Sequence, residues 1–278
     1  MATLGIIGWG VVGQATGAGF GKKHKIIWNN KSDKGSTPVP ELCQKSDFVF
    51  LCLPTPMKAD HSGIDLKCMN QVVDEVAPLL ADTSKPLVVK STVIPGTTAS
   101  YAKKYPKVAF AMNPEFLTEI NAPWDFLHPD RVVIGAQNED VANRIARLHR
   151  DVMGYKVKIF TTDTTTAELV KYMSNTYMAT KVIFANEMSD LAEKLGINYN
   201  DVADMVGADK RIGKSFLKVS PFKGFGLKCF PKDTVAILGL AKKLKVDLSV
   251  LQAVWKKNLK VRKVRDWEGI KGAVNNNL

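Results

Sequence analysis

The stretch TLGIIGWGVVGQ, residues 3–14, joins a short apolar run to Gly8, Gly10 and Gly13 in the spacing GxGxxG. The apolar run predicts a buried strand, and residues 11–20 have the pattern of a helix. Glycine at these positions permits a tight turn, close approach of a ligand to the backbone, and close packing of helix on strand. The first amide groups of such a helix can bind phosphate oxygens. The stretch therefore predicts a turn that binds the pyrophosphate of a dinucleotide, with a purely structural glycine turn as the alternative.

Apolar runs alternate with helical patterns through the first ~150 residues, as in a parallel sheet covered by helices. Their near-continuous hydrophobicity is typical of strands that are buried on both faces. The predicted strands are 3–8, 25–28, 47–54, 86–91, 108–112, 131–135 and 156–160, and the predicted helices between them are 11–20, 65–80 and 139–152. The sequence thus predicts an α/β fold built on a Rossmann-type doubly wound parallel sheet.

The pattern changes at Asp163, where a helical stretch without Pro or Gly continues to about Leu195. An apolar stripe runs along it at steps of three and four, with one gap of seven. Its members are Val170, Met173, Tyr177, Phe184, Met188, Leu191 and Leu195. Such a stripe packs either between domains or against a second subunit. Shorter helices are predicted at 199–206, 233–245 and 248–264, so we expect a Rossmann-type domain at 1–162 and a long helix with a small all-helical domain at 163–278.

Composition is that of an ordinary globular protein, with 45% hydrophobic and 24% charged residues in 278. No apolar run approaches the ~20 residues needed to cross a bilayer. The N-terminus enters a strand directly, without the basic flank of a secretory signal. The cysteines at 43, 52, 68 and 229 lack the spacing of disulfide frameworks, and the four histidines are scattered. We therefore expect reduced thiols, no metal site, no membrane contact and a cytoplasmic location.

The formal charge is +12, and much of it lies in KKNLKVRKVR, residues 256–265. A solvated basic helix face explains such a run most simply. A nucleic-acid patch or attraction of small polyanions is also conceivable, but no aromatic interleaving or recognition motif accompanies the charge. We expect no nucleic-acid partner.

An acidic residue that binds the adenosine ribose is expected ~20 residues after the glycine turn. That region reads IIWNNKSD, with Asn29 and Asn30 in the expected place and Lys31 after them. An amide can hydrogen-bond a ribose hydroxyl but lacks the charge that repels a 2′-phosphate. Asp33 could substitute if the loop curls back. These residues predict a nicotinamide dinucleotide and leave the choice between NAD and NADP open.

Two further clusters carry reactive side chains. GFGLKCFPKD, residues 224–233, places Cys229 within four residues of Lys228, Lys232 and Asp233, a setting that can favour an exposed thiolate. The alternative is a surface loop with an incidental cysteine. Lys171 and Asn175 stand at i and i+4 on one face of the long helix, where a solvated flank is the alternative.

Six motifs in order make the chain recognisable: GWGVVG, KSTVIPGTT, NPEFLTE with DFLHPDRVVIG, AELVKYMSNTYMATKVIFANE, RIGKSFL and CFPKD. From about residue 4 to 240 the sequence resembles the UDP-glucose/GDP-mannose dehydrogenase family. The resemblance implies NAD-dependent oxidation of the C6 alcohol of a nucleotide sugar to a carboxylate in two hydride transfers. DFLHPDR is most similar to the family's UDP-glucose enzymes, so the implied conversion is UDP-glucose to UDP-glucuronate.

The resemblance also implies the roles of single residues. Cys229 would attack the aldehyde to give a thiohemiacetal and then a thioester. Lys171 and Asn175 would stabilise charge on the C6 oxygen, Asp233 would position water or accept protons, and Glu119 with Thr92 would handle the hydrolytic water. The implied cofactor-binding residues are Gly8, Gly10, Gly13, Asn29, Asn30, Thr92 and Glu115. The implied substrate-binding residues are Glu115, Phe116, Leu117, Lys171, Asn175, Arg211 and Lys232.

The sequence departs from the family pattern in three places. The 278 residues do not include the family's further C-terminal domain, and the segment after the second strand is short. The usual GGSCFPKD reads GLKCFPKD, with Leu227 and Lys228 beside the cysteine. Two other functions therefore stay open: oxidation of a different nucleotide hexose or a simpler alcohol, and non-catalytic or partner-dependent binding of a sugar nucleotide or dinucleotide. A homodimer through the 163–195 helix is expected, as in relatives.

Overall fold

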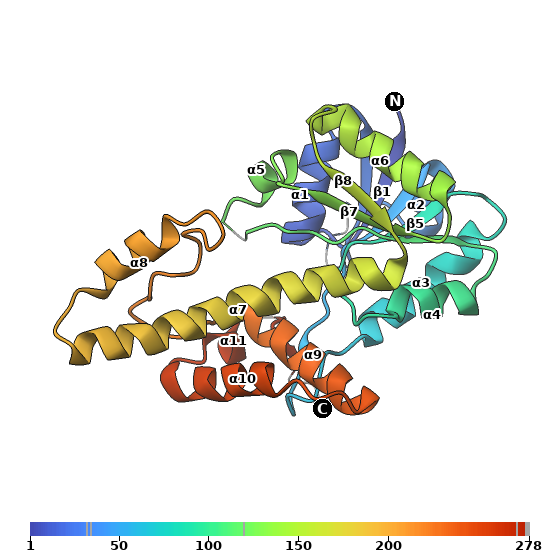
Figure 1. Cartoon of the computed structure of the whole chain (residues 1–278). Coiled ribbons are helices and arrows are strands. Elements are labelled where there is room, and N and C mark those ends of the chain that lie inside the picture. The colour runs from blue at the N-terminus through green and yellow to red at the C-terminus, as the bar shows by residue number, and fades with distance from the viewer. Residues whose placement is uncertain (32, 34, 119, 271, 276–278) are drawn as a thin grey trace. The chain divides into compact units, whose positions relative to one another are not determined.

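The computed structural model describes residues 1–31, 33, 35–118, 120–270 and 272–275. It divides into two units (Figure 1). The first comprises Met1–Thr55 and Leu66–Lys171, and the second comprises Pro56–Asp65 and the chain from Tyr172 onward. The predicted functional division between residues 162 and 163 stays a prediction.

A seven-stranded sheet forms the centre of the first unit, in the order β2-β1-β3-β5-β6-β7-β8. The strands are β1 Thr3–Ile7, β2 Lys25–Asn29, β3 Phe48–Leu51, β5 Pro86–Val89, β6 Ala109–Met112, β7 Val132–Ala136 and β8 Ile159–Thr162. All seven predicted strands are present, and the sheet is mostly parallel. The predicted Rossmann-type α/β fold is confirmed.

One pair of strands departs from the parallel arrangement. β6 and β7 are antiparallel, with Ala111 opposite Ala136, whereas β7 and β8 are parallel again. A parallel neighbour needs a crossover connection, usually a helix packed on the sheet. The chain between β6 and β7 instead holds the short helix α5, Ala122–Leu127, which packs on helix α1, Val11–Phe20. Among the described residues of this connection α5 is too short to serve as a crossover helix, so β7 can return in the opposite direction.

Helices cover both faces of the sheet (Figure 1). On one face α1, α5 and α6 (Glu139–Met153) bury a core that includes Phe20, Phe50, Phe126 and Ile145. On the other face lie α2, Val39–Lys45, α3, Lys67–Leu80, and α4, Thr97–Lys104. The five inner strands are buried on both sides, as their continuous hydrophobicity predicted. The edge strands β2 and β8 are only partly buried, because each has a neighbour on one side alone.

The strand order changes direction between β1 and β3, because β2 lies on one side of β1 and β3 on the other. In open α/β sheets, ligands bind at such a switch point, outside the carboxyl ends of the strands. β1, β3, β5 and β6 are mutually parallel, so their carboxyl ends share one edge of the sheet. The glycine turn and the segments after β3, β5 and β6 therefore meet at this edge.

The second unit is mainly helical. Helix α7, Thr164–Lys194, contributes its residues from Tyr172 onward, and α8, Tyr199–Gly207, α9, Cys229–Leu244, α10, Ser249–Val261, and α11, Asp266–Gly269, follow. Figure 1 shows α9 and α10 beside α7, where Ala179 and Ile183 pack with Phe225 and Val254. A two-residue parallel ladder between β4, Met57–Lys58, and β9, Val274–Asn275, departs from the all-helical prediction, since strands this short leave no sequence pattern. Among the described residues, no helix combines the length and apolarity that a bilayer crossing requires.

The predicted stripe on α7 is exposed along much of its length. Met173, Tyr177, Phe184 and Leu191 are 68%, 64%, 58% and 52% exposed. The opposite side of the same helix supplies the buried Ala179 and Ile183. The stripe is thus an apolar surface separate from the core of the second unit.

Candidate active site

The glycine turn has the geometry of a phosphate cradle. Gly8 has φ +97°, and a Cβ there would lie 2.3 Å from the carbonyl oxygen of Cys52. A Cβ at Gly13 would lie 2.0 Å from the carbonyl oxygen of Gly8, so α1 can pack on β1 only with glycine there. A Cβ at Gly10 would have no other atom of the described residues within 4 Å. The turn thus has two glycines required by packing and one that opens to solvent at the start of α1, which fits a bound pyrophosphate.

The predicted ribose-binding residues lie beside this turn. The carbonyl oxygen of Asn29, the last residue of β2, accepts a hydrogen bond from the Gly8 amide at 2.9 Å. The Asn29 side chain donates to the Thr37 carbonyl at 2.8 Å. Asn29 therefore holds the loop closed, and Asn30 is the first residue beyond the strand.

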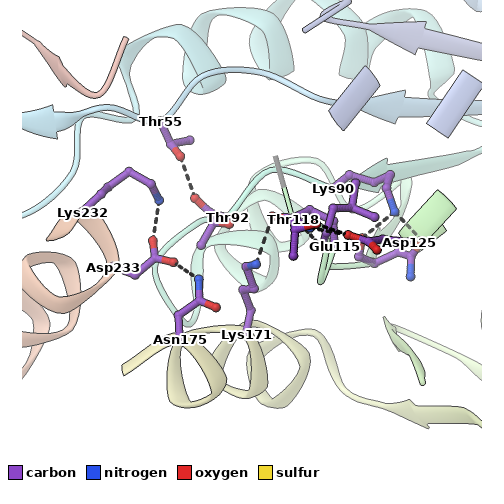
Figure 2. Close-up of polar contacts among 12 residues, drawn as sticks. Thr55, Lys90, Thr92, Glu115, Thr118, Asp125, Lys171, Asn175, Lys232 and Asp233 are labelled. Atoms are coloured by element: carbon purple, nitrogen blue, oxygen red, sulfur yellow. Dashed lines mark hydrogen bonds and ion pairs between the residues drawn. The ribbon is translucent and has the colours of Figure 1, made fainter. Parts of the chain in front are cut away.

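The segments after β3 and β5 are tied together at the same edge of the sheet. The Leu53 amide donates to Ser91 Oγ at 2.7 Å, and Thr55 Oγ1 donates to the Thr92 carbonyl at 2.8 Å (Figure 2). Thr92 is half-buried. The predicted site residue Thr92 is thus held at the edge that carries the glycine turn.

Glu115 and Lys171 form a buried ion pair within the first unit (Figure 2). Lys171 Nζ lies 3.0 Å from Glu115 Oε1, and the side chains are 4% and 12% exposed respectively. The Leu117 amide donates to Glu115 Oε2 at 2.6 Å. Burial by itself would raise the pKa of Glu115, but the Lys171 charge, these hydrogen bonds and Lys90 outweigh it and hold the pKa below its usual value. The pair therefore presents an ammonium group beside a carboxylate that stays ionised.

The predicted substrate-lining residues Phe116 and Leu117 follow Glu115 directly. Lys171 Nζ lies 5.6 Å from the centre of the Phe116 ring, and the Arg131 guanidinium lies 4.1 Å from it. Such distances allow cation–π attraction, which fixes the ring between two cations. The segment 115–117 is thus held by charge as well as by packing.

Sequence reasoning missed a buried polar network behind Glu115. Lys90 Nζ donates to Asn113 Oδ1 at 3.1 Å, and Asn113 Nδ2 donates to the Val133 carbonyl at 2.8 Å. This orientation makes Asn113 Oδ1 an acceptor, so His149 must donate to it through Nε2, at 2.9 Å. Burial lowers the pKa of Lys90 to about 8 and lowers that of His149 well below its usual value. The network fixes the backbone from which Glu115 projects.

Glu168 is a second residue that sequence reasoning missed. Its carboxylate accepts hydrogen bonds from the amides of Gly96, at 2.6 Å, and Thr98, at 2.8 Å. These amides begin helix α4, so Glu168 caps α4 and fixes the start of α7 against it. Burial raises the pKa of Glu168 despite these bonds. Its position three residues before Lys171, on the same face of the helix, was the available sequence signal.

In the second unit Cys229 begins helix α9. The prediction that this helix starts at residue 233 was wrong, because Pro231 falls in the first turn, where its missing N–H costs no hydrogen bond. Cys229 is exposed, whereas Cys52 is buried with its pKa raised to about 12. The amide groups and dipole at a helix N-terminus favour an anionic sulfur. The position of Cys229 thus suits a nucleophile.

One turn further along α9, Asp233 is the centre of a buried polar group (Figure 2). Asn175 Nδ2 donates to Asp233 Oδ2 and Lys232 Nζ pairs with Asp233 Oδ1, each at 2.5 Å. Asp233 and Asn175 are 1% and 5% exposed. Residues four apart share a helix face, so Asp233 and Cys229 lie on the same side of α9. Four predicted site residues are therefore gathered here.

Two other predicted residues lie elsewhere or outside the description. Arg211 follows α8, its side chain is 89% exposed, and it pairs with Asp209 at 2.6 Å. Its substrate contact stays a prediction. Glu119 lies outside the described residues.

Sequence models of the UDP-glucose/GDP-mannose dehydrogenase family match two parts of the chain. The family's NAD binding domain matches residues 25–153, and its central domain matches residues 165–260. The UDP-glucose 6-dehydrogenase of Rickettsia typhi is 40% identical over 216 residues, which cover 76% of this chain and 49% of that protein. The UDP-glucose 6-dehydrogenase YwqF of Bacillus subtilis is 37% identical over 224 residues, which cover 77% of this chain and 49% of that protein. The chain thus spans about half the length of the curated relatives it matches.

Solved structures give the same assignment. The UDP-glucose dehydrogenase of the archaeon Pyrobaculum islandicum matches with a TM-score of 0.84 and 31% identity, covering 94% of this chain and 68% of that one. A 3-hydroxyisobutyrate dehydrogenase of Mycobacterium tuberculosis, 15% identical with a TM-score of 0.70, covers 94% of this chain and 93% of that one and shares the fold. Both family models, the curated relatives and the archaeal structure agree with the motifs found in the sequence. The chain belongs to the UDP-glucose/GDP-mannose dehydrogenase family.

Proposed function

We propose that this chain is an NAD-dependent oxidoreductase that converts UDP-glucose to UDP-glucuronate in two oxidation steps. The observation that carries the proposal is the position of Cys229, exposed at the start of α9, with the buried Asp233 group one turn away. A buried carboxylate contributes little to packing. Beside a nucleophile, it can accept the proton that is released when a covalent intermediate is hydrolysed. Residues 1–162 would serve as the cofactor domain and residues 163–278 as the catalytic helical domain.

The chain's own residues would act in sequence on the sugar C6. When bound, NAD would accept a hydride at each oxidation. Lys171, paired with Glu115, would stabilise negative charge on the C6 oxygen during the first oxidation. Asn175, at i+4 from Lys171 on α7, would donate a second hydrogen bond to the same oxygen.

The Cys229 thiolate would then attack the aldehyde carbon and form a C–S bond, giving a thiohemiacetal. Oxidation of that adduct leaves a thioester, and water cleaves its C–S bond to release the carboxylate and regenerate the thiol. Asp233 would accept a proton from this water, with Thr92 and Glu119 helping to orient it. Lys232 pairs with Asp233 and would hold its carboxylate in place for that role.

The remaining roles are proposed on the same family matching. Glu115, Phe116, Leu117, Lys232 and Arg211 would contact the sugar nucleotide, and Glu115 with Thr92 would border the nicotinamide. The exposed apolar stripe on α7 supports a homodimer through that helix. The competing interpretation is a binding protein without catalysis. It is disfavoured because Cys229 is present and exposed at the start of α9, and because Asn175 contacts Asp233 and Lys171 contacts Glu115.

The decisive measurement is the formation of reduced cofactor from purified protein, UDP-glucose and NAD. We expect two reduced cofactors per sugar consumed, with UDP-glucuronate as the product. Cys229→Ser should lower uronate formation by more than about 10³-fold while NADH binding is retained. Cys68→Ser, at a half-buried position on α3, is the matched control and should behave as the unmodified chain. Cofactor binding without turnover of any nucleotide sugar, or full turnover by Cys229→Ser, would contradict the proposal.

A further inference from the structure

The adenosine end of the proposed cofactor site lacks the carboxylate that normally rejects a 2′-phosphate. A carboxylate after the second strand binds the ribose hydroxyls and repels the 2′-phosphate of NADP. Here β2 ends at Asn29, and the next residues are Asn30 and Lys31. The side chains at the ribose position are therefore two neutral amides followed by a cation.

The described residues of the loop after β2 are tied to the end of the strand by hydrogen bonds. The Thr37 amide donates to the Trp28 carbonyl at 2.9 Å, and the Asn29 side chain donates to the Thr37 carbonyl at 2.8 Å. The Asn30 carbonyl accepts from the Asp33 amide at 2.9 Å and from Ser36 Oγ at 3.1 Å. These bonds return the loop to the strand and hold the backbone of Asn30.

The only acid between residues 29 and 37 is Asp33, and its carboxylate serves the loop itself. Asp33 Oδ1 accepts a hydrogen bond from the Gly35 amide at 2.9 Å, and its carbonyl accepts from Ser36 Oγ at 2.8 Å. The loop does curl back, as one sequence interpretation required. Because Oδ1 of this carboxylate is engaged in the turn, we take Asn30 rather than Asp33 as the residue that would meet the ribose.

We propose that this site accepts a 2′-phosphate on the adenosine ribose, so that NADPH binds with an affinity within about tenfold of that of NADH. Asn30 would donate its amide N–H to a hydroxyl or a phosphate oxygen alike, and Lys31 would attract the phosphate charge. The inference rests on the proposed function, because it concerns the same cofactor site. It goes beyond that function by assigning a second cofactor class to the site.

A pair of tryptophans beside the glycine turn supplies a direct signal for binding. Trp9, inside the GxGxxG motif, stacks on Trp28 of β2 with ring centres 5.1 Å apart and planes 17° from parallel. Trp28 directly precedes Asn29, so the pair would lie close to the adenosine half of a bound cofactor. Reduced nicotinamide absorbs where tryptophan emits, so quenching of this emission reports binding without any turnover.

The test is a fluorescence titration of the full chain with NADH and with NADPH. We expect dissociation constants within about tenfold of each other. Asn30→Asp should raise the dissociation constant of NADPH at least about tenfold, because it restores the charge that repels the 2′-phosphate. The dissociation constant of NADH should not rise. Lys31→Met should raise the dissociation constant of NADPH and leave that of NADH unchanged. Asp33→Asn is the control for charge in the same loop, and it should change the ratio of the two dissociation constants by less than about twofold. Displacement of NADPH by 2′,5′-ADP, compared with displacement by 5′-ADP, shows whether the 2′-phosphate is bound at the adenosine end of the site.

The possible outcomes separate the two proposals. If NADH binds tightly and NADPH binds more than about 100-fold more weakly, the inference is overturned and the proposed function still stands. An unchanged NADPH affinity in Asn30→Asp would also overturn it. Binding of neither nucleotide would instead refute the cofactor half of the proposed function, and with it the inference.

Discussion

Leu227 is held in a backbone conformation that favours glycine, two residues before the candidate nucleophile. Its φ is +60°, its amide donates to Asp266 Oδ2 at 3.1 Å, and its side chain is 57% exposed. The left-handed region costs a non-glycine residue about 1–2 kcal/mol. The family resemblance places a glycine here. The turn that leads into Cys229 thus carries a leucine in a conformation that favours glycine.

Replacing Leu227 with glycine should raise the free energy of unfolding by about 0.5–1 kcal/mol. Relief of the left-handed strain, about 1–2 kcal/mol, exceeds the loss of about 0.5–1 kcal/mol that glycine causes through unfolded-chain entropy. Denaturant unfolding followed by circular dichroism measures the difference. Leu227→Ala is the matched control, because it removes the exposed side chain but keeps the strained Cβ, and it should give no gain. Equal stabilisation by Ala and Gly would show that strain is not the cause.

The site residues that the sequence predicts are those whose motif signals their chemistry. Cys229, Lys171 and the glycines stand out because each lies in a short motif whose residue types indicate one role. Lys90 and Glu168 were missed because their roles depend on partners 23 and 72 residues away in the chain. A single sequence does not show such pairings. Long-range polar contacts are therefore the part of the site that needed the structure.

At the scale of elements, the β1–α1 turn offers a test that separates ligand approach from packing. Gly10→Ala should weaken NADH binding at least about tenfold with little change in stability, because its Cβ points into open space at the helix start. Gly13→Ala should instead lower the free energy of unfolding by about 1–3 kcal/mol, because its Cβ meets the Gly8 carbonyl. Tryptophan quenching and thermal unfolding measure the two effects. The reverse result, with Gly10→Ala destabilised and binding intact, would refute this arrangement of the turn.

The type of an element was predictable where a periodic hydrophobic pattern extended over many residues. The boundaries of elements and the directions of strands were not predictable in this way. The predicted 163–195 helix agrees closely with α7, Thr164–Lys194, because an uninterrupted stripe defines it. The start of α9 was placed four residues late, since a proline in the first turn looks like a helix breaker. The antiparallel direction of β7 depends on how the 113–131 connection packs. That packing is a tertiary property and leaves no local pattern.

At the scale of the whole molecule, the apolar stripe on α7 lies outside the buried core of the second unit. Met173, Tyr177, Phe184 and Leu191 recur at steps of four and seven residues, each at least half exposed. Sustained apolar surface on one helix face is typical of an interface rather than of a solvated helix. A twofold axis across α7 would pair the stripe with its own copy, since such an interface is self-complementary. The proposed homodimer follows from this surface.

Introducing charge into the stripe should separate the subunits. Tyr177→Glu and Phe184→Glu each place an unpaired carboxylate in an apolar contact, which should weaken dimerisation by about 2 kcal/mol or more. Sedimentation velocity over a range of protein concentrations measures the shift from dimer to monomer. Tyr177→Phe, which keeps the apolar area and removes only the hydroxyl, is the matched control and should stay dimeric. Because both positions are exposed and lie away from the buried Ala179 and Ile183, the monomers should keep the circular dichroism of the unmodified chain. A chain that is monomeric before substitution, or dimers that survive both charges, would exclude α7 as the interface.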